Sequence, residues 1–149
     1  MSLRFPAYLS PQPTTGPNLA HANDLCANAL NVDPLPFGSI ATTTGATSDF
    51  ATTTCSVAST DVGIWYEFTG GDKIVEIAAT QATFNTRFSL FEGATCEEQT
   101  CKMFTDIGGF NNFMSFAASS SETYRLLVSG VSGTSGSTNI DITVSDLLR

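Results

Sequence analysis

Strict alternation of apolar and polar residues is the feature that most limits what this chain can fold into. Five stretches alternate with a period of two, over residues 64–68, 75–79, 87–90, 124–129 and 139–145. Successive side chains of a β-strand point to opposite faces of its sheet, so this period indicates strands with one buried face. The 3.6-residue period of an amphipathic helix does not follow residue 30. The sequence therefore predicts an all-β protein.

Turn signals separate the predicted strands and set their number. Gly70-Gly71-Asp72 lies between two strands at hairpin spacing, and a Gly- and Ser-rich loop spans residues 130–137. Residues 42–60 are rich in Thr and Ser, and we interpret them as one strand followed by a long loop. Seven or eight strands joined by such turns favour an antiparallel β-sandwich.

The N-terminal part of the chain has a different character. Four of the six prolines fall within residues 1–22, which we interpret as a proline-rich linker or as non-native terminal residues. No signal-peptide pattern opens the chain, and we expect it to be a domain of a larger secreted protein. Residues 23–30 predict a short helix with Asn23 as its N-cap. Residues 23–149 are then expected to form a single domain.

Charge excludes two classes of partner. Charged residues make up only 13% of the chain, and the net charge is -8. A nucleic-acid surface needs clustered Lys and Arg, and only Lys73 and Lys102 supply lysine. No run of 18 apolar residues is present, so no membrane insertion is expected. Such a domain is compatible with cations, neutral sugars or a basic protein, although the charge also serves solubility alone.

Four cysteines indicate an oxidising compartment. They are Cys26, Cys55, Cys96 and Cys101, and their spacings lack the CxxC pairs of a zinc site. Of the three possible pairings we predict Cys26–Cys55 with Cys96–Cys101, the second bond closing a polar turn. Such bonds persist outside the cytosol, so we expect an extracellular or cell-surface location.

The motifs of an enzyme are missing. The only histidine, His21, lies in the predicted linker, which is a poor place for a general base. No G-x-S-x-G, Walker loop or G-x-G-x-x-G occurs. We therefore expect a non-catalytic protein.

Calcium is the candidate cofactor, because Ca²⁺ prefers carboxylate, amide and carbonyl oxygens. Asn23 and Asp24 precede the predicted helix, and Asp49 and Asp61 flank the loop that contains Cys55. These four residues form the predicted metal site. The alternative is that Asn23 only caps the helix and that Asp24 favours the helix N-terminus through its charge.

Aromatic side chains supply the second candidate site. Trp65 alternates against Ile64 and Tyr66, which we assign to the core, so it is a candidate platform for stacking on a sugar. The alternative is a structural Trp that covers the second face of the sheet or packs under a loop. Phe110, Phe113 and Phe116 could form a surface patch, but we expect at least two of them in the core.

The order of these features over residues 22–146 resembles the bacterial pre-peptidase C-terminal domain in its disulfide-containing form. The resemblance is carried by Asn23-Asp24-x-Cys26-x-x-Ala29, Gly45-Ala46-Thr47-x-Asp49, Cys55, Ile64-Trp65-Tyr66-x-Phe68, Phe84-x-Thr86-x-Phe88-Ser89-Leu90-Phe91, Cys96 with Cys101, and Tyr124-x-Leu126-x-Val128. It implies a jelly-roll-like β-sandwich that serves as a non-catalytic accessory module of secreted enzymes and surface proteins.

The resemblance also implies a calcium site at the start of the domain. Asn23 and Asp24 match the Asn-Asp pair that helps to ligate calcium in collagen-binding relatives from clostridial collagenases. The acidic residues that usually precede that pair are replaced here by Ala20, His21 and Ala22.

The sequence thus predicts a monomeric module that binds an extracellular glycan or protein. The alternative is a structural spacer, adhesin-like in character, that contacts neighbouring domains of its parent protein.

Overall fold

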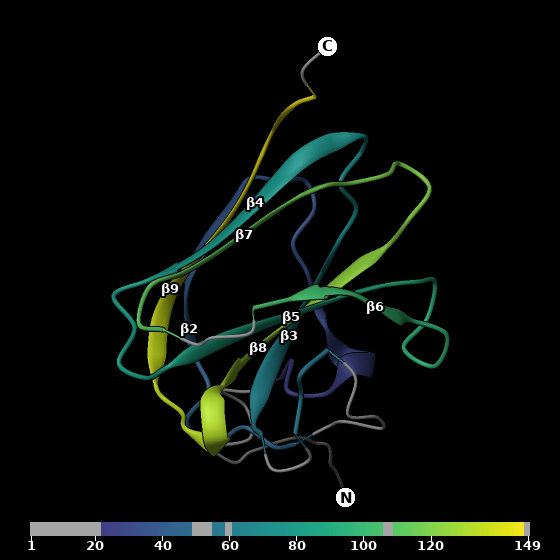
Figure 1. Ribbon diagram of the computed structural model, residues 1–149. Helices are drawn as coiled ribbons and strands as arrows, with labels where there is room; N and C mark the ends of the chain where they lie inside the picture. The colour runs from purple at the N-terminus through teal and green to yellow at the C-terminus, as the bar shows by residue number, and fades with distance from the viewer. Residues whose placement is uncertain (1–21, 49–54, 59–60, 106–108, 148–149) are drawn as a thin grey trace, which may run out of the picture.

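A computed structural model describes residues 22–48, 55–58, 61–105 and 109–147 of the chain, and it confirms the predicted all-β fold (Figure 1). Nine strands form two sheets within these ranges. The strands are β1 (Leu30–Asn31), β2 (Phe37–Thr42), β3 (Gly63–Phe68), β4 (Lys73–Thr80), β5 (Thr86–Glu92), β6 (Thr100–Phe104), β7 (Asn112–Ala117), β8 (Tyr124–Gly130) and β9 (Ser137–Asp146).

The two sheets pack face to face as a β-sandwich (Figure 1). Sheet A has the strand order β1-β3-β8-β5-β6, and sheet B has the order β2-β9-β4-β7. All neighbouring strands are antiparallel except β1, which pairs with β3 in parallel. The long strand β9 is central in sheet B, where it pairs with both β2 and β4.

The turn at residues 70–72 does not make the predicted hairpin, because β3 and β4 belong to different sheets. The chain crosses here from sheet A to sheet B, and the connection from β7 to β8 crosses back beside it. Asp72 joins the two crossings, since its carboxylate accepts a hydrogen bond of 2.8 Å from the amide of Ser120. A side chain at Gly70 would collide with Ala118, so only glycine fits this close approach.

The main core lies between the sheets, and the alternating residues supply it as predicted. Tyr66 and Tyr124 are 3% and 1% exposed, which confirms their assignment to the core. The ring of Tyr124 packs against Phe68 and Phe116, at centroid distances of 5.9 and 5.1 Å. The hydroxyl of Tyr124 accepts a hydrogen bond from the Ser119 amide.

A second apolar cluster covers the outer face of sheet A. It consists of Cys26, Cys55, Val57, Trp65, Phe91 and Leu127. Because of this cover, every residue of β8 is buried, although its sequence pattern predicts a half-buried strand. The loops that supply the cover are long and carry the cysteines.

The predicted disulfide pairing is wrong. The disulfides join these loops to the β6 edge of sheet A. Cys26 is bonded to Cys96, and Cys55 is bonded to Cys101. The turn between residues 96 and 101 is present without a bond across it. Each disulfide therefore fixes one covering segment to the β5–β6 hairpin, so the two bonds hold the second cluster closed.

The predicted helix over residues 23–30 is also wrong. Only a single 3-10 turn, η4 (Cys26–Asn28), forms, and no side chain caps it. In the predicted strand-and-loop segment 42–60, Thr42 ends β2, and the described residues 43–48 and 55–58 contain no strand. No helix in the described ranges has the length and apolar character needed to cross a membrane.

Candidate functional site

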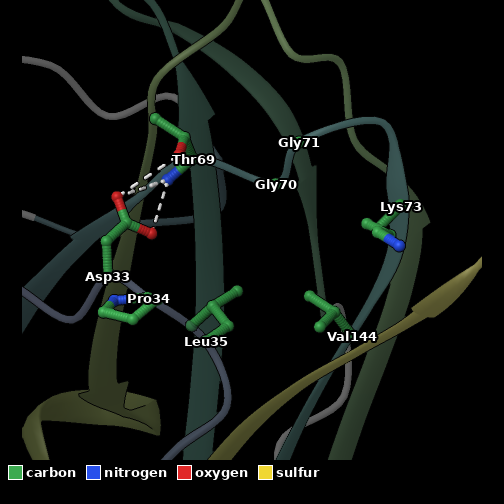
Figure 2. A pocket seen from close by; sticks show the side chains of 8 residues that line it. All are labelled: Asp33, Pro34, Leu35, Thr69, Gly70, Gly71, Lys73 and Val144. Carbon is green, nitrogen blue, oxygen red and sulfur yellow. Dashed lines mark hydrogen bonds between the residues drawn. The ribbon is translucent and has the colours of Figure 1, made fainter.

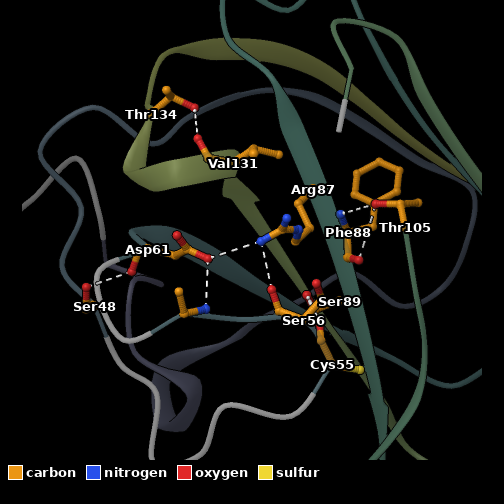
Figure 3. Close-up of polar contacts among 11 residues, drawn as sticks. Ser48, Cys55, Ser56, Asp61, Arg87, Phe88, Ser89, Thr105, Val131 and Thr134 are labelled. Carbon is orange, nitrogen blue, oxygen red and sulfur yellow. Dashed lines mark hydrogen bonds and ion pairs between the residues drawn. The ribbon is translucent and has the colours of Figure 1, made fainter. Parts of the chain in front are cut away.

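Asp61, a predicted calcium ligand, is buried and neutralised by an arginine (Figure 3). Its Oδ2 lies 3.4 Å from Nη1 of Arg87, and it accepts a hydrogen bond of 2.9 Å from the amide of Ala58. The same Nη1 donates to the carbonyl of Ser56 at 2.7 Å. Asp61 thereby links Ala58 to Arg87 of β5.

Asn23, the second predicted ligand, pairs with the edge of β3 in place of capping a helix. Its side-chain amide donates to the carbonyl of Trp65 at 2.9 Å, and its own carbonyl accepts from the Trp65 amide at 2.8 Å. These two bonds continue the pairing of β1 with β3, and they satisfy the backbone groups of Trp65 at the edge of β3.

Asp24 accepts two hydrogen bonds from Thr47, at 3.2 Å from the amide and 2.9 Å from the hydroxyl. The next residue, Ser48, donates from its hydroxyl to the carbonyl of Asp61 at 2.6 Å. Asp24 and Asp61 are thus attached to adjacent residues of one loop. Asp49 follows directly but lies outside the described residues.

The structure therefore brings Asp24 and Asp61 to one end of the sandwich through a hydroxyl-rich loop. The sequence reasoning missed the residues that engage them, namely Arg87, Thr47 and Ser48. The sequence does contain a hint of the role of Arg87. It is one of only six basic residues, and it lies between two core positions of β5. A buried cation in such a chain requires a buried acid.

Trp65 does not present a stacking platform, because it is only 2% exposed. Its ring packs 5.6 Å from that of Phe91, inside the second cluster. The indole Nε1 is buried and has no hydrogen-bond partner within the described part of the chain. The alternative of a structural Trp beneath a loop is the correct one.

The exposed aromatic residues lie elsewhere. Phe110 and Phe113 are 54% and 58% exposed, whereas Phe116 is in the core, so the expectation that at least two of the three are buried is wrong. Phe104, at the end of β6, is also exposed. Phe104 belongs to β6 of sheet A, Phe113 belongs to β7 of sheet B, and Phe110 lies just before β7.

A shallow hollow of about 290 Å³ lies at the end of the sandwich where β3 crosses to β4 (Figure 2). Asp33 and Lys73 face it from opposite sides, and Leu35 and Val144 form its floor. Both charged groups are engaged: the Asp33 carboxylate accepts from the amide and hydroxyl of Thr69, and Lys73 pairs with Asp146. The hollow thus offers apolar contact and no unpaired charge.

The described residues show no metal cluster, and their shifted pKa values belong to buried tyrosines. No three His, Cys, Asp or Glu side chains within the described ranges gather closely enough to hold a metal ion. Burial raises the pKa of Tyr66 to about 12, and burial also raises the pKa of Tyr124. Both tyrosines lie in the main core, where such shifts follow from the low polarity of the surroundings.

Similarity to a solved structure identifies the fold. The chain has the fold of a pre-peptidase C-terminal domain. A similar solved structure is the pre-peptidase C-terminal domain of collagenase from Bacillus anthracis, with a TM-score of 0.54. The two sequences are 12% identical over 77% of this chain and 94% of the other. No known family description matches the sequence, and no curated protein does either.

Proposed function

We propose that the domain is a non-catalytic accessory module of a secreted or cell-surface protein, and that it binds an extracellular polymer. The observation that carries this proposal is the fold, which the chain shares with a C-terminal domain of a collagenase. Two disulfides that fasten the covering loops support an oxidising, extracellular location.

The polymer is a protein or a glycan, and exposed side chains outside the second cluster contact it. Burial of Trp65 removes the one indole from any binding surface. Among the described residues, the exposed aromatic side chains available for contact are Phe104, Phe110 and Phe113. Within the described residues, Lys73 and Lys102 are both held in ion pairs, which disfavours an acidic polymer.

Co-sedimentation with insoluble fibrillar collagen, chitin, cellulose and peptidoglycan tests this function. We expect the domain to sediment with one of these polymers and to release no soluble product from it. A domain that stays in the supernatant with all four would instead favour a structural spacer that contacts other domains of its parent protein.

We propose calcium binding as a second activity, with Asp24 as its centre. One oxygen of Asp24 receives both hydrogen bonds from Thr47, and no described residue donates to the other oxygen, Oδ1. Asp24 is half-buried and follows Asn23 in the chain, and Ca²⁺ prefers carboxylate and amide oxygens as ligands. Asp61 fits this donor set poorly, because the guanidinium of Arg87 already balances its charge.

A further inference from the structure

Sheet edges are sites where another chain can add a strand, and natural proteins protect them. Within the described residues, the edges are β1 and β6 in sheet A and β2 and β7 in sheet B. Strand β1 is only two residues long. Strand β6 carries Lys102, and its pairing with β5 contains a register shift. Short length, lysine and irregular pairing are all protective features.

Strand β2 is protected in a different way. Pro36 immediately precedes it, and Gly38 within it weakens the strand. The side chain of Asp141 lies close over Gly38. The carbonyl of Ile40, at the centre of the strand, accepts a hydrogen bond from the Ser39 hydroxyl.

Strand β7 is protected only at its start, where the amide of Phe113 donates a hydrogen bond of 3.0 Å to the side chain of Asn112. Its sequence, Asn-Phe-Met-Ser-Phe-Ala, contains no charge, proline or glycine. The hydrogen bond from the Ala118 amide to the Lys73 carbonyl fixes the phase of its pairing with β4. Bonded pairs alternate along an antiparallel ladder, so Met114 and Phe116 turn their backbone groups towards β4. Ser115 and Ala117 turn theirs outwards, where no strand of the described residues pairs with them.

The sheet face beside this edge is acidic and has small side chains. Ser115 lies opposite Glu76 of β4, and Phe113 lies opposite Ala78, which is next to Asp141 of β9. Glu76 and Asp141 are exposed and form no ion pair within the described residues. A strand added outside β7 would lie about 10 Å from β4, two strand spacings away. Because the side chain of Ser115 is small, a lysine or arginine of the added strand can extend over it to the carboxylate of Glu76.

We propose that β7 binds an extended polypeptide of alternating basic and apolar residues by strand addition. Its basic side chains lie on the face that carries Glu76 and Asp141, and its backbone continues the ladder from Ser115 and Ala117. Exposed Phe113 supplies apolar contact at one end. This inference rests on the proposed binding function and names the class of its partner: a protein with a basic extended segment.

The test uses two soluble probes, an alternating Lys-Val octapeptide and its Glu-Val counterpart, with binding followed by amide chemical shifts and fluorescence anisotropy. We expect the Lys-Val peptide to bind with shifts centred on Ser115 and Ala117, and the Glu-Val peptide not to bind. Ser115→Pro removes only an outward amide and should weaken binding by at least about tenfold, equivalent to one lost backbone hydrogen bond. Glu76→Gln should weaken it as well.

Thr42→Pro is the matched control, because Thr42 also turns its amide outwards, on the opposite edge β2. It should leave binding unchanged. If Ser115→Pro proves to be unfolded by circular dichroism, Ser115→Lys places a charge on the same edge without altering the backbone, and it should weaken binding too.

Equal affinity of the wild type and the Ser115 variants would overturn the proposal, as would equal affinity for both peptides. A concentration-dependent dimer that Ser115→Lys abolishes would also overturn it, by assigning the edge to a second copy of the chain. If the Ser115 variants still sediment with an insoluble polymer, the edge proposal alone fails. Absence of any polymer binding by the wild type marks failure of the proposed function itself.

Discussion

Asp61 and Arg87 form a buried ion pair on the outer face of sheet A, with side chains that are 1% and 13% exposed. The pair joins Ala58 to strand β5, because Asp61 also accepts from the Ala58 amide, and Arg87 donates to the carbonyl of Ser56. Three buried polar atoms near the pair, Oδ1 of Asp61, Nε of Arg87 and Oγ of Ser129, have no hydrogen-bond partner among the described residues. Arg87 and Ser129 lie opposite each other in the β5–β8 ladder.

Removal of the acid should therefore be costly. Asp61→Asn leaves the guanidinium of Arg87 without its counter-charge in a buried place, and such changes typically cost about 3–5 kcal/mol. Urea unfolding at neutral pH measures this loss. Lys102→Ala, in the partly exposed pair with Glu92, is the control and should cost at most about 1 kcal/mol. Equal costs for the two variants would contradict a structural role of the Asp61–Arg87 pair.

The disulfide connectivity gives a second prediction. Peptide mapping of the unreduced protein should recover Cys26 with Cys96 and Cys55 with Cys101. The bonds span 70 and 46 residues of sequence, so the chain-entropy model gives about 4 kcal/mol for each. Replacement of one pair by serines should lower the unfolding free energy by about that amount. A peptide that links Cys96 to Cys101 would contradict the structure.

Periodicity predicted the two-sheet fold well because it is a local property of each strand. The stretches around Tyr66, Ile77, Phe88, Leu126 and Ile142 all became strands that face the core. Strands β1, β2, β6 and β7 were not predicted by alternation, because they are short, lack strict alternation or lie at sheet edges. Whether an edge strand forms depends on how it pairs with the neighbouring strand. A short stretch of sequence does not contain that information.

The disulfide pairing and the site depended on long-range packing, which the sequence could not supply. The Cys96–Cys101 bond was predicted because residues 96–101 have the sequence of a polar turn that such a bond would close. In the structure both cysteines are used to fasten segments 23–29 and 55–58 over Trp65. The same cover buries Trp65, which the alternation placed towards solvent. It also buries Asp61, which the sequence suggested as a calcium ligand. The resemblance over residues 22–146 was informative because it combined several weak sequence features in a fixed order along the chain.

Alkaline pH should destabilise the domain through its buried tyrosines. The folded pKa of Tyr66 is raised from 10.0 to about 12, so the folded state holds a proton that the unfolded state releases. Stability is therefore complete below pH 10 and is lost as the pH rises towards 12, at about 1.4 kcal/mol per pH unit.

Tyr66→Phe should leave the unfolding free energy at pH 7 nearly unchanged and reduce this slope. Tyr66→Ala should cost about 3–5 kcal/mol at pH 7, as do aromatic truncations in other cores. The measurements are urea titrations at pH 7 and between pH 10 and 11. An equal slope in the wild type and in Tyr66→Phe would contradict the burial of the phenol.

The single tryptophan gives an optical check on the second cluster. Trp65 is buried against Phe91, so its emission should be blue-shifted and resistant to quenching by iodide. Addition of a bound polymer should not change this emission directly. Strong iodide quenching of the folded protein would restore Trp65 as a candidate stacking residue and contradict the structure.

Calcium binding is tested by thermal unfolding in millimolar CaCl₂ against EDTA. A ligand of the folded state at 100 times its Kd stabilises by about 2.7 kcal/mol, which raises the Tm of a domain of this size by roughly 5–10 °C. We expect such a shift in the wild type. Asp24→Asn should abolish it, because the variant keeps an acceptor for Thr47 but loses the charge that attracts the ion.

Asp33→Asn is the matched control for that experiment. Asp33 also accepts hydrogen bonds from a threonine, Thr69, but it lies beside the hollow at the β3–β4 crossing. Its variant should retain the calcium shift, because no ion is expected there. A Tm that is the same in CaCl₂ and EDTA would instead leave Asp24 with a purely structural role. It would then only hold Thr47, whose neighbour Ser48 donates to the carbonyl of Asp61.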